Sequence, residues 1–388
     1  MGSLLRKIMF THNKLPAAIL LACTSSTAYA LDPAAMDFDG IQVTPTLEVA
    51  GTHDSNYEAT PTAESAWITS ITPSVTITAF GRKSQYDLNY TLNHKAFNKS
   101  GAKNLTSHYL SATAALEFDV RNQLGLSASI ANTEESANAF TPGELNAFKT
   151  STIGANYVYG AESATGNIEL GFQKASKRSA NDFNKDQEND VNTTSAGFIY
   201  KATAKTKLTA EMISRDFDYI SNTALNSRNT SYLLGARWEA TAQTTGFARF
   251  GKQTKDYDTA GIKSANGNRW SLSVDWAPKS YSVVNIAANQ LIDEGTYGAN
   301  FTKTTNQSIA WNHDWGRGYT STLSYTNSFK DYDATREDKV NAYGIGLTYM
   351  AKRWMDIAIN YSKTNQDSND NNFDYDRDLV TISVNLSL

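Results

Sequence analysis

The chain has 388 residues, of which 40% are hydrophobic, and a formal net charge of −4. Its mean hydropathy of −0.45 excludes a membrane protein built from many helices, because each span would need about 20 apolar residues in a row. Aromatic residues make up 11% of the chain and charged residues only 19%. This polar, weakly charged and tyrosine-rich composition is typical of a long array of β-strands.

The first 30 residues have the layout of a secretory signal peptide. Basic residues without any acidic ones occupy 1–14, a short apolar run follows at 15–22, and Ala28-Tyr29-Ala30 forms an A-x-A cleavage site. We expect cleavage after Ala30, which leaves 31–388 as a single domain. A lipoprotein signal that ends at Cys23 is the alternative. Either signal takes the chain out of the cytoplasm.

The predicted mature chain is acidic and has no cysteine. Cys23 is the only cysteine of the sequence, so residues 31–388 hold no disulfide and no thiolate metal site. Removal of the signal leaves 32 basic and 39 acidic residues, a net charge of −7. This charge argues against a nucleic-acid partner.

Beyond residue 30 the dominant period is two, with apolar residues on one face and small polar residues on the other. The last segment is the clearest, because Val380, Ile382, Val384, Leu386 and Leu388 alternate with polar residues. Such alternation predicts an all-β fold, a transmembrane antiparallel up-and-down β-barrel of about 18 strands. The predicted strand centres are Thr46, Val75, Leu88, Ala114, Leu126, Tyr157, Leu170, Phe198, Leu208, Leu234, Phe247, Leu272, Ile286, Ile309, Leu323, Ile345, Ile357 and Val384.

A soluble β-sandwich also alternates, but aromatic residues favour the membrane barrel. Tyr or Trp stands at the ends of several apolar faces, as in the aromatic girdles at membrane interfaces. The candidate girdle residues are Tyr232, Trp238, Trp270, Trp276, Tyr349 and Tyr361. We therefore expect the outer membrane of a Gram-negative bacterium, with lipid and lipopolysaccharide as surroundings.

The predicted links between strands alternate between short and long. Short basic turns include 81–84, 120–122, 204–205, 277–280, 316–318 and 351–353, and long links include 51–65, 98–107, 133–147, 178–191, 218–229, 256–268, 293–303, 330–338 and 364–377. An even strand number then places both termini and the short turns in the periplasm. The short turns either dock an acidic partner surface or, as we favour, simply end strands with soluble residues.

The sequence offers little that could bind metal or catalyse a reaction. Residues 367–378 approximate the spacing of a calcium loop, but Asn372 replaces the required glycine, so a hydrated surface loop is the better interpretation. His53, His94 and His108 lie near Asp54, Asp87 and Ser107 at predicted outer strand ends. A rim hydrolase is therefore an alternative, although we expect no enzyme, no metal site and no cofactor.

Polar residues on the second face of the predicted strands would line a water-filled lumen. The candidate lumen residues are Asp87, Asn89, Glu117, Arg237, Glu239, Asp275, Asn285, Asn289, Asn312, Asp314, Asp356 and Asn360. Amide, hydroxyl and carboxylate groups offer exchangeable hydrogen bonds to hydroxyl-rich solutes. A polar wall is also what any water-filled lumen requires.

The first predicted hairpin resembles the opening of the putative β-barrel porin 2 family. The resemblance rests on Val43-Thr44-Pro45-Thr46-Leu47-Glu48, His53-Asp54-Ser55-Asn56-Tyr57, Ile71-Thr72-Pro73-Ser74-Val75 and Tyr86-Asp87-Leu88-Asn89-Tyr90. His53 and Ser55 depart from the family's usual aromatic and acidic residues. The resemblance implies an outer-membrane component of Wzx/Wzy-type polysaccharide secretion, with the polysaccharide chain, a periplasmic export protein and a co-polymerase as partners.

Our principal hypothesis is therefore that the barrel takes part in the export of an exopolysaccharide or capsular polysaccharide. The alternative is a general or solute-selective diffusion porin. Such a porin would have an inward-folded segment with opposed acidic and basic residues, for which 133–147 is the best candidate, although this segment contains only acidic charges.

Overall fold

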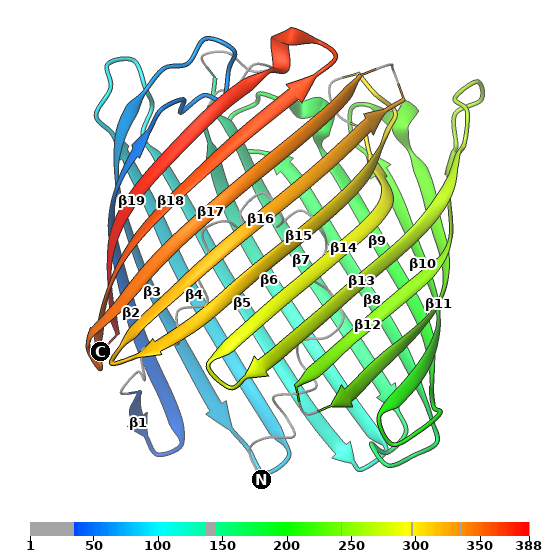
Figure 1. Cartoon of the computed structure of the whole chain (residues 1–388). Helices are drawn as coiled ribbons and strands as arrows, with labels where there is room; N and C mark the ends of the chain where they lie inside the picture. Colours follow the sequence, from blue (N-terminus) through cyan, green and yellow to red (C-terminus); the bar gives the residue numbers. More distant parts are fainter. Residues whose placement is uncertain (1–34, 137–143, 242, 296–297, 334–335, 388) are drawn as a thin grey trace.

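The computed structural model describes residues 35–136, 144–241, 243–295, 298–333 and 336–387. They form one sheet that closes on itself (Figure 1). The predicted signal peptide lies outside the described residues. The strands are β1 (Met36–Phe38), β2 (Ile41–Asp54), β3 (Ala66–Phe80), β4 (Ser84–Phe97), β5 (Leu105–Asp119), β6 (Asn122–Glu135), β7 (Asn146–Tyr159), β8 (Gly166–Ser179), β9 (Asn189–Lys201), β10 (Thr206–Tyr219), β11 (Ser227–Thr241), β12 (Thr244–Tyr257), β13 (Ala265–Lys279), β14 (Ser282–Glu294), β15 (Phe301–Gly316), β16 (Tyr319–Tyr332), β17 (Glu337–Lys352), β18 (Met355–Ser368) and β19 (Tyr375–Ser387).

Strands β2 to β19 form a closed barrel of 18 antiparallel strands. Each strand pairs with its neighbour in sequence, and β19 pairs with β2 to complete the circle. The predicted fold is thus confirmed, and each of the 18 predicted centres lies in a different strand. Strand β1 was not predicted. It pairs with β2 through a turn at Asp39 and Gly40, whose φ angles of 54° and 87° suit a tight hairpin.

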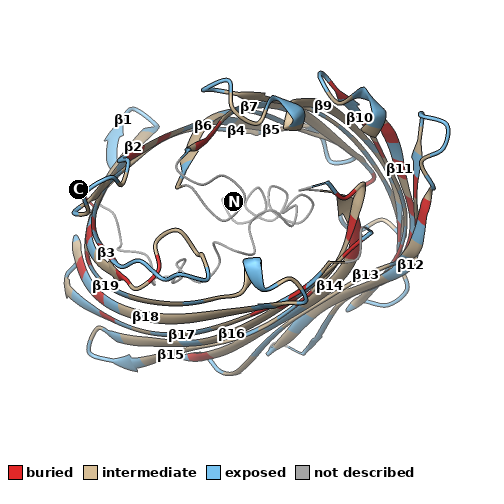
Figure 2. Ribbon diagram, turned by 90° about the horizontal axis from the view of Figure 1, so that it is seen from above, coloured by how far each residue is buried: buried red, intermediate tan, exposed pale blue. Residues whose placement is uncertain are grey.

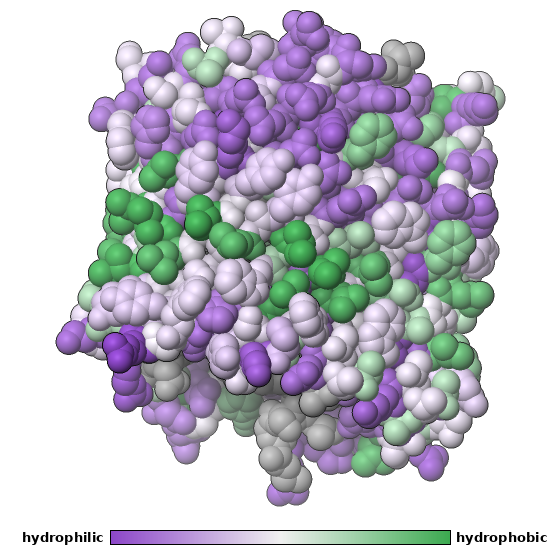
Figure 3. Space-filling view, viewed as in Figure 1, coloured by the Kyte–Doolittle hydropathy of each residue, from purple (hydrophilic) through white to green (hydrophobic). Residues whose placement is uncertain are grey.

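The alternating sequence places apolar side chains on the outer face of the barrel. On β17, Tyr343, Ile345, Leu347 and Tyr349 are exposed on the outer face, and Gly344 and Gly346 lie between them on the inner face. Figure 3 shows the result on one side of the barrel, as an apolar band across the middle with a hydrophilic region above it. The two tyrosines of β17 stand about 20 Å apart along the strand, from about 3.3 Å per residue. This distance suits interfacial aromatic residues on both sides of an apolar layer.

The two ends of the barrel differ in the length of their connections. At one end, called here the short-turn end, links such as 120–121 and 353–354 have only two residues; the other end, the long-loop end, carries the longer links. The turn Gly316-Arg317-Gly318 has three successive positive φ angles, which two glycines adopt without strain. Short 3-10 helices η2 (Lys185–Gln187), η3 (Thr223–Leu225) and η4 (Asn371–Phe373) lie in long loops.

The long loops are shorter than predicted. Link 364–377 was predicted as a loop, but β18 continues to Ser368 and β19 begins at Tyr375. Strands of 13 to 16 residues extend beyond the apolar band, and their polar ends carry no hydrophobic alternation. No helix among the described ranges is long and apolar enough to cross a membrane.

Candidate functional site

All twelve predicted lumen residues lie on the inner face, opposite to the apolar outer residues of their strands. The structure brings three of them together across β13 to β15. The side-chain amide of Asn285 donates to the Asp275 carboxylate at 2.7 Å, and the side-chain amide of Asn312 donates to the side-chain oxygen of Asn285 at 3.2 Å. These residues form a polar ladder along the inner wall.

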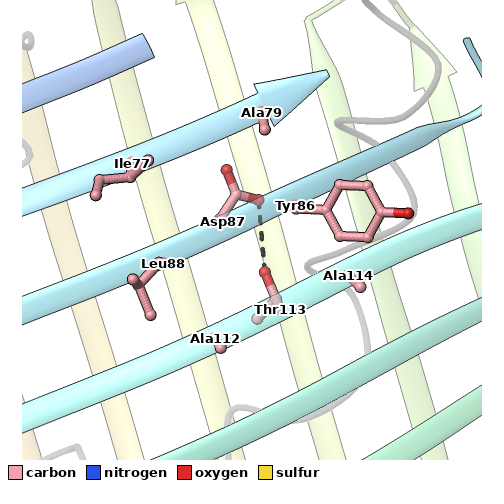
Figure 4. Close-up of a pocket in the computed structure, with 8 residues that line it drawn as sticks. All are labelled: Ile77, Ala79, Tyr86, Asp87, Leu88, Ala112, Thr113 and Ala114. Atoms are coloured by element: carbon pink, nitrogen blue, oxygen red, sulfur yellow. Dashed lines mark hydrogen bonds between the residues drawn. The ribbon is translucent and has the colours of Figure 1, made fainter. Parts of the chain in front are cut away.

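A second group surrounds Asp87 and Asn89 on β4. The Thr78 hydroxyl donates to Asp87 at 2.7 Å, and Thr113 donates to its other oxygen at 3.4 Å, as Figure 4 shows for Thr113. Asn89 donates to Thr76 at 2.8 Å. On the outer face of the same strands, small residues such as Ala112 border a shallow apolar hollow of ≈330 Å³.

One strand end leaves the wall and lies inside the lumen. The pairing of β14 with β13 ends at Gln290 and Trp270, whereas its pairing with β15 continues to Glu294. The next β14 residues, Leu291 and Ile292, are buried. Seen from above, this part of β14 stands inside the line of β11 to β13 (Figure 2). The β14–β15 hairpin therefore occupies part of the barrel's cross-section.

Hydrogen bonds pin this inward hairpin to the inner faces of β11 and β12. Gln253 donates to the Ile292 carbonyl oxygen at 2.6 Å and accepts from the Ile292 N–H at 2.9 Å. Asn229 also donates to the Ile292 carbonyl, at 3.2 Å, and the Tyr257 hydroxyl donates to the Asn300 carbonyl at 2.7 Å. Both backbone groups of Ile292 are thus satisfied by side chains of the wall.

A buried ion pair completes the attachment. Lys255 is fully buried and forms a salt bridge with Glu294, which is 19% exposed. The Tyr219 hydroxyl donates to the second Glu294 oxygen at 2.7 Å, and Lys255 donates to Ser227 at 3.0 Å. An acidic residue of the hairpin thus faces a basic residue of the wall.

Four arginines lie on the inner face of the strands that hold this hairpin, and Arg215 and Arg269 are the two nearest to its level. We call Arg215 on β10, Arg237 on β11, Arg249 on β12 and Arg269 on β13 the arginine wall. Two glutamates lie among them. Arg249 forms a salt bridge with Glu211 at 2.8 Å, and Arg237 lies 3.8 Å from both Glu211 and Glu169.

Inward-facing glycines allow the arginines to reach across strands. Gly235 lies between Arg249 and Glu211, and a Cβ atom there would stand 2.8 Å from the Arg249 side chain. Arg269 likewise crosses β12 at Gly251 and donates to Ser231 on β11 at 2.9 Å. A Cβ atom at Gly235 would also stand 2.5 Å from the Ala248 carbonyl oxygen, and one at Gly251 would overlap the Tyr232 carbonyl oxygen, so a larger residue at either position would disturb the neighbouring strand.

The family-like motif at 53–57 closes the barrel at the long-loop end. Asp54 is fully buried and accepts a bidentate pair of hydrogen bonds from Arg377 of β19. Asn56 donates to the Asp376 carbonyl at 3.1 Å. Tyr57 packs on Phe97, and burial beside Glu58 raises the pKa of its phenol to about 12. The motif therefore joins the first barrel strand to the last.

The three histidines of the hydrolase alternative lie on the outer face. The ring of His94 contacts the Thr106 hydroxyl at 2.9 Å, and His108 contacts the Tyr90 hydroxyl at 2.9 Å. His53 packs against Trp67. Within the described ranges, no group of three or more histidine, cysteine or acidic residues is arranged to hold a metal ion.

The six predicted girdle residues also lie on the outer face. Segment 133–147, predicted to fold inward, lies partly outside the described residues. The inward position of the β14 end and most of the arginine wall were not predicted from the sequence. Strict alternation does place Glu211 and Arg249 inward, opposite to Met212 and Phe250, so this signal was available.

The comparisons agree with the observed architecture. A family model described as "Putative beta-barrel porin 2" matches residues 40–388. No curated protein matches the chain. Among solved structures, Pseudomonas aeruginosa OpdK with vanillate has a TM-score of 0.51 and 12% identity, covering 89% of this chain and 99% of OpdK. Pseudomonas aeruginosa OccK2 (OpdF) with glucuronate has a TM-score of 0.53 and 10% identity, covering 90% and 99%.

Proposed function

The chain belongs to the Putative beta-barrel porin 2 family, and from this membership and the lumen geometry we propose that it is an outer-membrane channel through which small solutes diffuse. The short turns and both termini would face the periplasm, and the long loops the cell exterior. The 1–30 signal peptide would direct export to this location. No step of this function requires a cofactor or a catalytic residue.

The inward hairpin carries the proposal. An element that occupies part of the lumen limits the size of solutes that pass, and opposed charges beside it act on those that enter. Here the buried Lys255–Glu294 pair holds the hairpin in place, and the arginine wall with its glutamates, Arg249 and Glu211 among them, supplies opposed charges on the inner face. This arrangement supports solute selection better than unhindered passage of a polymer.

The similar structures share the fold of this chain and contain small ligands. OpdK has been solved with vanillate and OccK2 with glucuronate, and both ligands are small molecules. Identities of 12% and 10% show a common fold and no shared ligand. The residues of this lumen therefore decide which solutes it would admit.

Conductance measurements test the proposal directly. The purified barrel, inserted into a planar lipid bilayer, is expected to open discrete ion-conducting channels, and proteoliposomes that contain it should swell in small sugars. Dextrans of several kilodaltons should not enter. A folded barrel that neither conducts nor admits small sugars would refute the proposal.

Polysaccharide export is the second candidate function. It is favoured by the polar ladder of Asp275, Asn285 and Asn312, whose amide and carboxylate groups suit hydroxyl-rich chains. A periplasmic export protein and a co-polymerase would then be partners. Loss of surface polysaccharide in a deletion strain that takes up small solutes normally would favour export over diffusion.

A further inference from the structure

We infer that the arginine wall selects small solutes that carry a carboxylate group. This inference rests on the proposed function, because it names the solute class that the channel would favour. It is argued from the charge balance of the wall, the unused donors of its arginines and their position beside the inward hairpin.

The charge balance of the wall is positive. Its four arginines are opposed by Glu169 and Glu211 within the wall and by Asp293 of the hairpin, which acts electrostatically on Arg269. Glu294 is already neutralised by Lys255. One positive charge therefore remains without a counter-charge where the hairpin narrows the lumen.

Arg215 provides the clearest unmet demand for an anion. Only 8% of its surface is exposed, and none of the described residues forms a hydrogen bond or an ion pair with its guanidinium group. Its positive charge acts on Arg269, three strands further along the wall. A buried cation without a partner is unfavourable, so an anion beside it would be stabilised.

The neighbouring arginines retain donors that a solute can use. A guanidinium group has five N–H donors. Among the described residues, Arg249 uses two of them, toward Glu211 and Ser271, and Arg269 uses one, toward Ser231. Arg249 is also 28% exposed, so the lumen reaches it. The planar fork of arginine matches the two oxygens of a carboxylate.

The wall continues into groups that suit the rest of a hydroxylated solute. Along the inner face of β13, Arg269 is followed by Ser271, Ser273 and Asp275 toward the short-turn end. Hydroxyl and carboxylate oxygens accept hydrogen bonds from sugar hydroxyls. Sugar acids combine both features, so glucuronate is a suitable probe.

The test compares glucuronate with glucose, which lacks the carboxylate. With the full-length barrel in planar bilayers, sodium glucuronate is expected to interrupt the current at least tenfold more strongly than glucose at equal concentration. In Arg215→Gln this preference should fall about tenfold, the effect of losing one charged hydrogen-bonding partner. Arg215→Lys, which keeps the charge without the fork, should retain part of it.

Matched controls separate the wall from general charge effects. Arg228→Gln removes an exposed arginine from the outer face of β11, where it pairs with Asp216, and should leave the glucuronate preference unchanged. Arg215 takes part in no salt bridge of the described residues, so Arg215→Gln breaks none of them. If that variant nevertheless fails to fold, Arg249→Gln serves as the second variant.

The outcomes distinguish this inference from the proposed function. Equal interruption by glucuronate and glucose, or an unchanged preference in both wall variants, would overturn the carboxylate selectivity while the channel itself stands. A folded wild-type barrel without any conductance would overturn both.

Discussion

Release of the inward hairpin is the sharpest consequence of the buried Lys255–Glu294 pair. The perturbation is Lys255→Met, which keeps the length of the apolar stem and removes the charge. Lys255 is fully buried and Glu294 is 19% exposed, so the variant leaves a largely buried carboxylate without its partner. Loss of one member of a buried ion pair costs about 3–5 kcal/mol.

The other contacts of the hairpin are of similar size. The three hydrogen bonds to the backbone of Ile292 contribute about 1 kcal/mol each, and burial of Ile292 adds about 1.5–3 kcal/mol. Removal of the ion pair therefore takes away about half of the attachment. A change of about 3 kcal/mol shifts the ratio of released to attached hairpin more than a hundredfold.

Single-channel recording detects the release. Lys255→Met should show larger mean conductance and greater open-channel noise than the wild type. The double variant Lys255→Met/Glu294→Gln should recover much of the low-noise current of the wild type, since no buried charge remains. Lys252→Met, three residues away on the outer face, is the matched control. Traces of Lys255→Met that equal those of the wild type, or an equal change in Lys252→Met, would refute the reasoning.

Three further predictions concern the wall of the barrel. Asp54→Asn should lower the free energy of unfolding by about 3–5 kcal/mol, because Arg377, its partner across the closure between the first and last barrel strands, stays half-buried without a counter-charge. Urea unfolding of the barrel from lipid vesicles measures this change, and the control Arg228→Gln, at an exposed residue, should leave unfolding unchanged. On β18, Ile359→Arg should lower the stability in vesicles by about 2–4 kcal/mol and Asn360→Arg by much less, because the first faces lipid and the second faces water; equal losses would contradict the assignment of faces. Gly235→Val should displace the Arg249 side chain that crosses β11 there and also press on the Ala248 carbonyl oxygen, so the glucuronate preference of the channel in bilayers should fall. Heat-modifiable migration identifies the folded barrel in which the preference is measured, and an unchanged preference of that folded barrel would show that the crossing is not required.

The sequence predicted the barrel well because the membrane imposes a simple rule. A strand that separates lipid from water must alternate, and the last strand does so through Val380, Ile382 and Val384. The rule fails where strands leave the membrane. Polar strand ends such as 364–368 carry no apolar alternation, so they were predicted as loop although they pair in register.

The candidate site was less predictable for a different reason. Arg215 and Arg269 stand next to predicted loops, where alternation no longer assigns a face. The inward position of Ile292 depends on Gln253 and Asn229, which are distant in sequence. Nothing local to β14 signals that its end leaves the wall, because Leu291 and Ile292 are ordinary strand residues. Only the tertiary pairing reveals it.

The lumen has an uneven distribution of charge that ties these features together. Its inward-facing acidic residues near the short-turn end include Asp87, Glu117, Glu239, Asp275, Asp314 and Asp356, each within five residues of that end of its strand. The inward-facing basic residues within five residues of the long-loop end include Lys95, Lys177, Arg215, Lys255, Arg269, Lys330 and Arg377, whereas Arg237 and Arg249 lie nearer the short-turn end. A channel must bind its solute firmly enough to admit it and weakly enough to release it. A more basic long-loop end that attracts an anion, followed by a more acidic short-turn end that repels it, would meet both conditions for a solute that moves from the long-loop end to the short-turn end. The hairpin stands near the more basic end, so the proposed size selection and charge selection would act at the same level of the lumen.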